Sequence, residues 1–355
     1  MEVYHCDHCD NLVFFENTVC LQCGHTLAYI PDLHQITSLE RKPDGAFATP
    51  LAVGKKFKLC ANYAQYDVCN WALPADSPET LCRSCRLNRT IPDLWNPANK
   101  TLWYKIEIAK RRLVYTLLQL GLPVMSKIDD PVRGQAYDIL ADPPGAGAPK
   151  VMTGHEAGLI TLALAEADDA EREKRRVAMR EPYRTLLGHL RHEIGHYYWD
   201  LLIQYSPRLQ AFRGLFGDEQ ASYADALQRH YDFGPPTDWQ QNFVSSYAAM
   251  HPWEDWAETW AHYLHIADTL ETAAAIGVRV RPARRNEPAM TRIVDPVGGG
   301  AARFDEMMEA WHPLTYALNE LNRGLGVGDA YPFVLPPKAV EKLRFVHDTI
   351  HATPT

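Results

Sequence analysis

The sequence predicts a mostly helical protein of mixed α and β structure, with a small cysteine-rich module followed by a larger domain. The chain has 355 residues, which exceeds the usual size of one domain. All eight cysteines lie between Cys6 and Cys85. Beyond them, apolar residues recur at the three- and four-residue steps of buried helix faces, with one short strand-like segment among them. We therefore expect a module over residues 1–95 and a second domain over residues 96–355.

The composition is that of an ordinary globular protein. Hydrophobic residues make up 46% and charged residues 23%, so a large core can be buried. The formal net charge of -8 argues against a general nucleic-acid binder, which needs a basic face to neutralise phosphates. The first residues have neither the basic nor the apolar region of a secretory signal, and the most apolar stretch, Leu113 to Met125, is too short to span a bilayer. We therefore expect a cytoplasmic protein that does not enter a membrane.

The cysteine spacing predicts two structural zinc sites in the module. Cysteines of a cytosolic protein stay reduced, so short-spaced pairs indicate metal rather than disulfides. Two Cys-x-x-Cys knuckles, separated by ten residues, present four thiolates to one tetrahedral ion, and the later four cysteines contain one further knuckle. Free structural cysteines or a redox pair would leave the repeated spacing unexplained. The first predicted site consists of Cys6, Cys9, Cys20 and Cys23, and the second of Cys60, Cys69, Cys82 and Cys85.

The module is too small to bury a core of its own, so bound zinc would supply folding energy directly. Its first expected role is therefore structural. The zinc ribbon also offers a surface for a protein partner, and a modest basic patch of Lys55, Lys56 and Lys58 lies within it. Because lysine clusters more often aid solubility, nucleic-acid contact through this patch is the weaker hypothesis.

The second domain is expected to begin with a helix from about residue 100 to 120, in which Ile106, Leu113 and Leu117 share a buried face. The proline- and glycine-rich run from 142 to 149 predicts a loop, because its prolines lack N–H donors. The stretch from Leu159 to Leu164 is short, apolar and partly β-branched, which favours a strand, with a helix as the alternative.

Two further helices and a long loop are expected after this strand. Pro182 suits the first turn of a long helix that would run to about Gln204. Another helix is expected from Gly217 to Tyr231, before the stop at Gly234-Pro235-Pro236. The stretch from Pro282 to Gly300 is rich in proline, arginine and glycine, so it predicts a long surface loop, either a plain connection or the rim of a functional site.

The long helix carries the sequence His192-Glu193-Ile194-Gly195-His196. Histidines four residues apart lie roughly 40° apart around a helix, so both can bind one zinc ion. Zinc in a catalytic site takes three protein ligands and leaves a position for water. Glu193 can then take a proton from the activated water and pass it to a leaving amine. Chance occurrence is the alternative, but no proline interrupts the surrounding helical segment.

The third ligand has to come from elsewhere in the chain. Trp199 and Leu202 stand where an extended metzincin motif has a glycine and a histidine, which excludes that group. Downstream, Glu254 and Glu258 are four residues apart and share a helix face, so one suits a ligand and the other an acceptor that orients a ligand histidine. Asp255 is the alternative ligand, and an ordinary solvated helix face is the alternative for both glutamates.

The motifs His192-Glu193-x-x-His196 and Glu254-x-x-Ala257-Glu258 together resemble those of the gluzincins, especially the lethal-factor-like and minigluzincin branch. The resemblance implies that Glu254 binds the catalytic zinc and that Glu258 supports a ligand. It also implies that Tyr247, which precedes Glu254 by about two helical turns, stabilises the oxyanion of the tetrahedral intermediate. A packing tyrosine is the alternative.

Over nearly its whole length, the chain also resembles bacterial zinc-binding metallopeptidases that join an N-terminal zinc ribbon to such a domain. This resemblance implies a zincin-like α+β fold and gives no substrate. In zincins, a strand placed like Leu159 to Leu164 pairs with the substrate backbone, although a plain core strand is the alternative. His155 and Glu156, which precede it, would then line the cleft.

Together these observations predict a zinc metallopeptidase that hydrolyses peptide bonds in a peptide or protein, with one catalytic and two structural zinc ions. One alternative is a zinc-ribbon adaptor that binds a peptide or nucleic acid through a non-hydrolytic domain, although such a domain has no need of Glu193. Another alternative keeps the chemistry but applies it to a non-protein amide.

Overall fold

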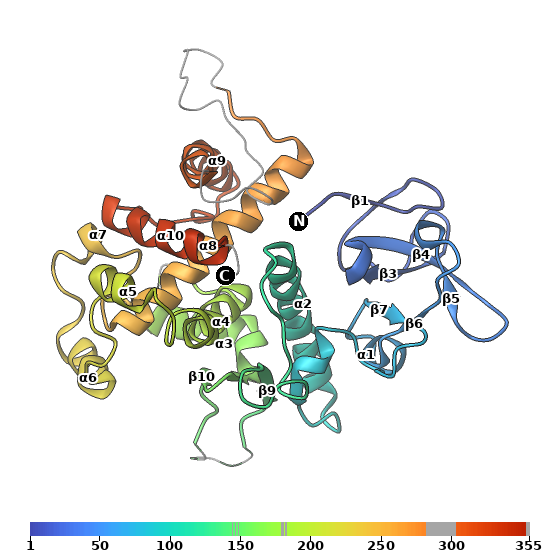
Figure 1. The fold of residues 1–355 in the computed structure, drawn as a ribbon, viewed down its shortest axis with the longest axis horizontal. Helices are drawn as coiled ribbons and strands as arrows, with labels where there is room; N and C mark the ends of the chain where they lie inside the picture. The colour runs from blue at the N-terminus through green and yellow to red at the C-terminus, as the bar shows by residue number, and fades with distance from the viewer. Residues whose placement is uncertain are drawn as a thin grey trace.

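The computed structural model describes residues 1–143, 145, 147, 149–178, 181, 183–281 and 303–352 (Figure 1). It confirms the α+β fold class, because an N-terminal region of short strands is followed by long helices around a small sheet. The predicted loop from Pro282 to Gly300 lies outside the described residues, as do Pro182 and part of the predicted 142–149 loop. Among the described residues, no helix is both long enough and apolar enough to cross a membrane.

The N-terminal region contains two small sheets. A hairpin pairs β1 (Tyr4–His5) with β2 (Leu12–Val13). An antiparallel sheet follows in the order β3-β4-β5-β6-β7, and a bridge between Tyr29 and Trp71 brings its two ends together. Its strands are β3 (Thr26–Ile30), β4 (Gln35–Arg41), β5 (Phe47–Ala48), β6 (Phe57–Leu59) and β7 (Ala72–Pro74), with helix α1 (Ala61–Tyr66) between the last two.

Helix α2 (Pro97–Gln119) follows and confirms the helix predicted there. It begins at Pro97 because a first-turn residue needs no N–H donor. The side chain of Asn96 caps it by accepting a hydrogen bond from the Ala98 N–H at 3.1 Å.

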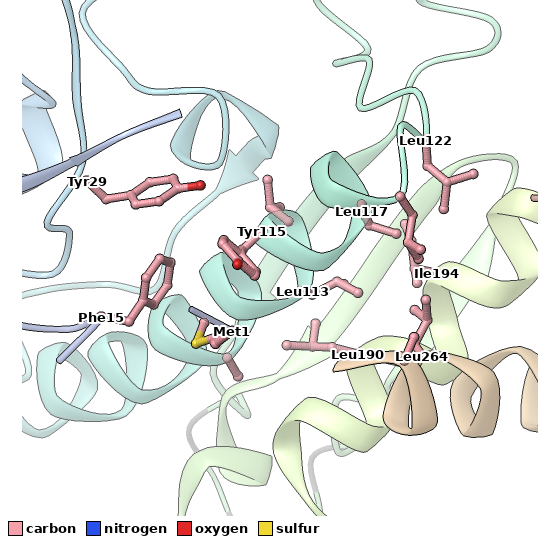
Figure 2. Close-up of a cluster of buried hydrophobic side chains, with 14 of the residues drawn as sticks. Met1, Phe15, Tyr29, Leu113, Tyr115, Leu117, Leu122, Leu190, Ile194 and Leu264 are labelled. Atoms are coloured by element: carbon pink, nitrogen blue, oxygen red, sulfur yellow. The ribbon is translucent and has the colours of Figure 1, made fainter. Parts of the chain in front are cut away.

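The core runs without interruption across α2 (Figure 2). On one side of the helix, Tyr115 contacts the rings of Phe15 and Tyr29 from the N-terminal region. On the other side, Leu113 and Leu117 pack toward two further helices. The residues that continue the cluster there are Leu190, Ile194 and Leu264.

The second sheet has the strand order β10-β11-β9-β8. Its strands are β8 (Asn88–Thr90), β9 (Ala136–Leu140), β10 (Gly154–Glu156) and β11 (Leu159–Ala163). β11 confirms the predicted strand, but it is paired on both sides, parallel to β9 and antiparallel to β10. The expectation that this strand itself offers an edge to a substrate is therefore wrong, because the edge strand is β10.

Helix α4 (Leu186–Leu202) is the predicted long helix, but it begins later than Pro182. The side chain of Thr185 caps it by accepting a hydrogen bond from the Gly188 N–H at 3.0 Å. Helix α8 (Pro252–Ile276) packs against α4. The remaining helices of this part of the chain include α3 (Asp169–Ala178), α7 (Trp239–Asn242), α9 (Phe304–Gly324) and α10 (Pro337–Ile350).

The helix predicted from Gly217 to Tyr231 is wrong at its start. Helix α5 (Leu209–Phe216) ends at Gly217, whose φ of +106° does not continue a helix. Helix α6 (Tyr223–Phe233) begins only after Ser222, whose hydroxyl accepts a hydrogen bond from the Asp225 N–H at 3.3 Å. The predicted stop at Gly234 is confirmed.

Candidate metal centre

Helices α4 and α8 approach each other closely beside the predicted site. A Cβ atom added at Gly195 would lie 3.0 Å from Cα of Ala257, so two small residues allow the backbones to meet. Nε1 of Trp256 donates a hydrogen bond to the Gly195 carbonyl at 2.8 Å. This contact places the first turns of α8 against the middle of α4, and so sets Glu254 beside the two histidines.

Three donor atoms converge where the helices meet. One atom each of His192, His196 and Glu254 lies within 4.8 Å of the others. Oε2 of Glu254 lies 3.0 Å from Nε2 of His192 and 3.6 Å from Nε2 of His196, without hydrogen-bond geometry to either. This buried oxygen has no hydrogen-bond partner among the described residues, which is unfavourable for a carboxylate unless a cation binds it. Two imidazoles and a carboxylate therefore fit a zinc ion.

Glu258 fixes the orientation of His192. Its Oε1 accepts a hydrogen bond from Nδ1 of His192 at 2.7 Å, and its Oε2 accepts one from the Ser245 hydroxyl at 2.6 Å. Nε2 of His192 is thereby left to face Glu254, where it could bind a metal. Burial opposes a charge on His192, but the adjacent carboxylates of Glu254 and Glu258 raise the pKa of His192 well above its usual range.

Two tyrosines approach the centre from the segment between α5 and α8. The Tyr223 hydroxyl donates a hydrogen bond to Oε1 of Glu254 at 2.9 Å and is also hydrogen-bonded to Tyr247. The ring of Tyr247 lies 6.0 Å from that of His192. Burial and then the charge of Glu254 raise the pKa of Tyr247, so its hydroxyl stays protonated as a donor. Tyr247 could be named from the sequence by resemblance, but Tyr223 and Ser245 could not, because no local spacing relates either residue to its partner.

Glu193 has a histidine beside it. Its Oε1 lies 3.2 Å from Nε2 of His189, one turn earlier on α4, and the other nitrogen of that ring lies 3.8 Å from Oε2 of Glu166. Glu166 pairs in turn with Arg184 at 2.8 Å. Burial acts to raise the pKa of Glu193, but the hydrogen bond and charge of His189 outweigh it and lower that pKa. His189 therefore contacts Glu193 and lies outside the group of converging donors.

The remaining residues considered from sequence lie around this group. Asp255 points away from the histidines, because its Oδ2 accepts a hydrogen bond from Nζ of Lys342 at 2.6 Å on α10. The ring of His196 packs against Trp253, with 3.9 Å between centroids, and lies 6.0 Å from the ring of His155 on β10.

A cavity of about 670 Å³ opens beside the centre. Its walls include His192, Glu193 and Tyr247, together with residues 152–153, which immediately precede the edge strand β10. The two residues expected there, at positions 155 and 156, are not part of its lining.

Both predicted cysteine sets come together in the N-terminal region. Within each set, the four sulfur atoms lie within 4.8 Å of one another, and the hydrogen-bonded sulfur pairs are 3.6 to 3.7 Å apart. None of the eight cysteines forms a disulfide. Four converging thiols fit a tetrahedral zinc ion. The first cysteine cluster consists of Cys6, Cys9, Cys20 and Cys23, and the second cysteine cluster of Cys60, Cys69, Cys82 and Cys85.

A buried cation lies beside the second cysteine cluster. Arg111 of α2 is only 1% exposed and donates a hydrogen bond to the Val68 carbonyl. Burial acts to lower the pKa of Arg111, but the nearby Cys69, Glu107 and Cys85 outweigh it and raise that pKa. A Zn²⁺ ion with four thiolate ligands has a net charge of about −2. The positive charge of Arg111 would offset part of this negative charge.

Known proteins resemble the chain over almost its full length. Residues 99–349, more than half of the chain, match the family described as "Putative zinc-binding metallo-peptidase", and residues 3–96 match a zinc-ribbon domain. The chain belongs to this metallopeptidase family.

Two relatives of the chain are "Uncharacterized protein Rv2568c" of Mycobacterium tuberculosis and "Uncharacterized protein Mb2598c" of Mycobacterium bovis. Each is 44% identical over 351 residues, which make up 99% of this chain and 95% of the relative. No solved structure matches the chain. The family and the cysteine clusters support zinc binding, and they confirm the resemblance to zinc-binding metallopeptidases with an N-terminal zinc ribbon.

Proposed function

We propose that the chain is a zinc-dependent peptidase that cleaves peptide bonds in a peptide or protein substrate. The observation that carries this proposal is the convergence of His192, His196 and Glu254, with Glu193 and His192 in the wall of one cavity. Two histidines on one helix and a glutamate on a second helix form a gluzincin-like arrangement. Membership of the metallopeptidase family supports the same assignment.

In this mechanism His192, His196 and Glu254 hold the catalytic zinc. When bound, zinc lowers the pKa of water and polarises a substrate carbonyl group. Glu193 takes a proton from the attacking water and delivers it to the departing amine, so it acts first as general base and then as general acid. Tyr247 donates its hydroxyl proton in a hydrogen bond to the carbonyl oxygen as negative charge develops there.

The substrate backbone is expected to pair with β10. Among the strands that the structure describes, β10 lies at the end of its sheet, antiparallel to β11. The two residues before β10 line the cavity beside the metal centre. An extended peptide added at this edge would therefore run past Glu193 and gain main-chain hydrogen bonds.

We further propose that the chain carries one catalytic and two structural zinc ions. The catalytic ion belongs to the centre between α4 and α8, and one structural ion belongs to each cysteine cluster. Four deprotonated cysteines leave no open position for a substrate, which supports a structural role for both clusters.

The variant Glu193→Gln tests the proposed mechanism. It should retain the zinc content of the parent chain, measured by elemental analysis, and lose cleavage because it lacks the carboxylate that moves the proton. New protein N-termini should appear in cells that make the parent chain and be absent from cells that make the variant. Glu181→Gln serves as the control, because Glu181 lines the same cavity and pairs with Arg184. Identical N-termini with parent and Glu193→Gln would contradict the proposal and favour an adaptor that binds without hydrolysis.

A further inference from the structure

Two histidines lie together beside the first cysteine cluster. Nitrogen atoms of His8 and His25 and the sulfur of Cys23 are all within 4.8 Å of one another. The two imidazole rings are tilted against each other, with 3.9 Å between centroids and 30° between planes. Nδ1 of His25 is buried and has no hydrogen-bond partner among the described residues. Imidazole nitrogen and thiolate sulfur are the atoms that zinc prefers.

The two zinc knuckles explain why these histidines meet. His8 lies inside the first knuckle, between Cys6 and Cys9, and His25 comes two residues after Cys23. Gly24, with a φ of +75°, turns the chain between Cys23 and His25. Because both knuckles close around the same four sulfur atoms, each carries its histidine to the same side of the cluster.

The charge of the first cysteine cluster gives a reason for a further cation there. One Zn²⁺ with four thiolates carries two net negative charges. The second cluster has Arg111 buried beside it to offset this charge. At the first cluster, the neighbouring cavity is lined by His8, His25 and several lysines. Two of these lysines already pair with carboxylates, Lys42 with Glu40 at 2.7 Å and Lys56 with Asp44.

We propose that His8 and His25 bind a further divalent transition-metal ion such as Zn²⁺, with the thiolate of Cys23 bridging it to the ion of the first cysteine cluster. A second divalent ion would bring the net charge of the four thiolates and two ions to zero. The neighbouring cavity leaves room for water to complete the coordination. This inference does not depend on peptidase activity, because it concerns only metal binding by the N-terminal region.

Counting bound zinc in the full chain tests this inference. The double variant His8→Asn/His25→Asn should bind one zinc ion fewer per chain than the parent, when both are saturated and then desalted. The control is His5→Asn/His34→Asn, which removes two exposed histidines of the same region and should keep the parent number. Cobalt substitution supplies a second measurement, because thiolate-to-cobalt absorption reports whether the two cysteine clusters remain formed.

Three results would overturn the proposal. The first is an equal zinc count in the parent and the His8→Asn/His25→Asn variant, which would mean that the histidines only pack or donate hydrogen bonds to Cys23. The second is an additional ion that desalting removes from the parent. The third result concerns the single variant His8→Asn, which is measured if the double variant loses its thiolate absorption. His8 is exposed, so this variant should keep both cysteine clusters formed. A zinc count equal to that of the parent, with intact absorption, would then refute the site.

Discussion

Tyr223 supports the candidate metal centre through a hydrogen bond to Glu254. Its hydroxyl holds Oε1 of Glu254, which directs Oε2 toward the two histidines. Groups that orient a metal ligand in this way contribute strongly to affinity, because a freely rotating carboxylate must be ordered when the ion binds. We therefore expect the Tyr223 hydroxyl to contribute measurably to zinc affinity at this site.

The variant Tyr223→Phe should weaken zinc binding at the catalytic centre by about 10- to 100-fold. The variant removes the hydroxyl that holds Glu254 and contacts Tyr247, and it keeps the ring that contacts His251 and Trp253. Competition with a chromophoric chelator measures the affinity. Tyr231→Phe is the matched control, since Tyr231 lies on the same helix and lines the cavity. Equal affinities in the parent and Tyr223→Phe would show that Glu254 needs no such support.

The site residues differ in how far sequence could reveal them. His192, Glu193 and His196 could be predicted because a helix brings positions four apart together by itself. Glu254 could be assigned only by resemblance, since its contact with the histidines depends on how α8 packs against α4. Tyr223 could not be predicted, because it reaches Glu254 across 31 residues and the intervening helix α7.

At the scale of elements, the metal centre depends on the contact between α4 and α8. Gly195 is the residue on α4 that permits this contact, because any side chain there meets the backbone of Ala257. The glycine inside the candidate zinc-binding motif therefore has a packing role, in addition to separating His192 from His196.

The variant Gly195→Ala should destabilise the fold by about 1–3 kcal/mol and reduce zinc affinity at the centre, because overpacking forces the helices apart. The new Cβ would lie 3.0 Å from Cα of Ala257 and 3.2 Å from Cβ of Trp260. Gly214→Ala on α5 is the control, because no atom lies within 4 Å of its added Cβ. That control should gain about 0.4–1 kcal/mol from reduced chain entropy. Denaturant unfolding measures the stability of both variants. A Gly195→Ala variant that is more stable than the parent would refute the packing role of Gly195.

Local sequence patterns predicted one helix and one strand of the core. Helix α2 was predicted from apolar residues at three- and four-residue steps, and strand β11 from a short, apolar and partly β-branched stretch. The break between α5 and α6 was missed, because it is set by the backbone of Gly217 and by the hydroxyl cap of Ser222. The edge position of β10 could not be predicted either, since strand order is fixed by long-range pairing.

The pairing of β8 with β9 predicts a dependence of stability on pH. Nε of Arg89 on β8 donates to Oδ1 of Asp138 on β9 at 2.9 Å. This hydrogen bond holds the pKa of Asp138 below its usual range. A lowered pKa stabilises the folded state above the ordinary carboxyl pKa of about 3.9, and that stabilisation is lost as the pH falls toward the folded-state pKa.

The variant Asp138→Asn should therefore be less stable than the parent near neutral pH, and the difference should shrink below about pH 4. The measurement is the free energy of unfolding of both chains across this pH range. Zinc release by acid affects both chains, so it cancels in the comparison. A difference that stays constant down to about pH 3 would contradict the role given to the Asp138 carboxylate.

At the scale of the whole molecule, α2 connects the zinc-binding N-terminal region with the peptidase-like domain. One hydrophobic cluster extends from Phe15 and Tyr29 across α2 to Leu190 and Leu264 (Figure 2). The division of the chain at residues 95 and 96 remains a prediction from cysteine distribution, which cannot reveal a shared core. The shared core implies that the N-terminal region stabilises the domain rather than folding as an independent module.

The electrostatic link between the two parts runs through Arg111 on α2. This buried guanidinium lies beside Cys69, Cys82 and Cys85 of the second cysteine cluster. A buried negative cluster that loses its partner cation is strongly disfavoured, whereas an exposed ion pair contributes little. The adjacent residue Arg112 forms such a partly exposed pair with Glu16 at 2.6 Å. Two neighbouring arginines on one helix thus permit a direct comparison.

The variant Arg111→Met should lose about 3–5 kcal/mol of stability and release zinc from the second cysteine cluster more readily, because it leaves buried thiolates without compensation. Arg112→Met should lose only about 0–1 kcal/mol and retain its zinc. Denaturant unfolding measures the stability, and zinc remaining after a timed chelator challenge measures retention. If the second cluster stabilises the domain through α2, amides of α2 and α4 should exchange hydrogen faster in Arg111→Met than in Arg112→Met. Equal exchange in the two variants would mean that the cluster is stable on its own and that α2 joins the two parts by apolar packing alone.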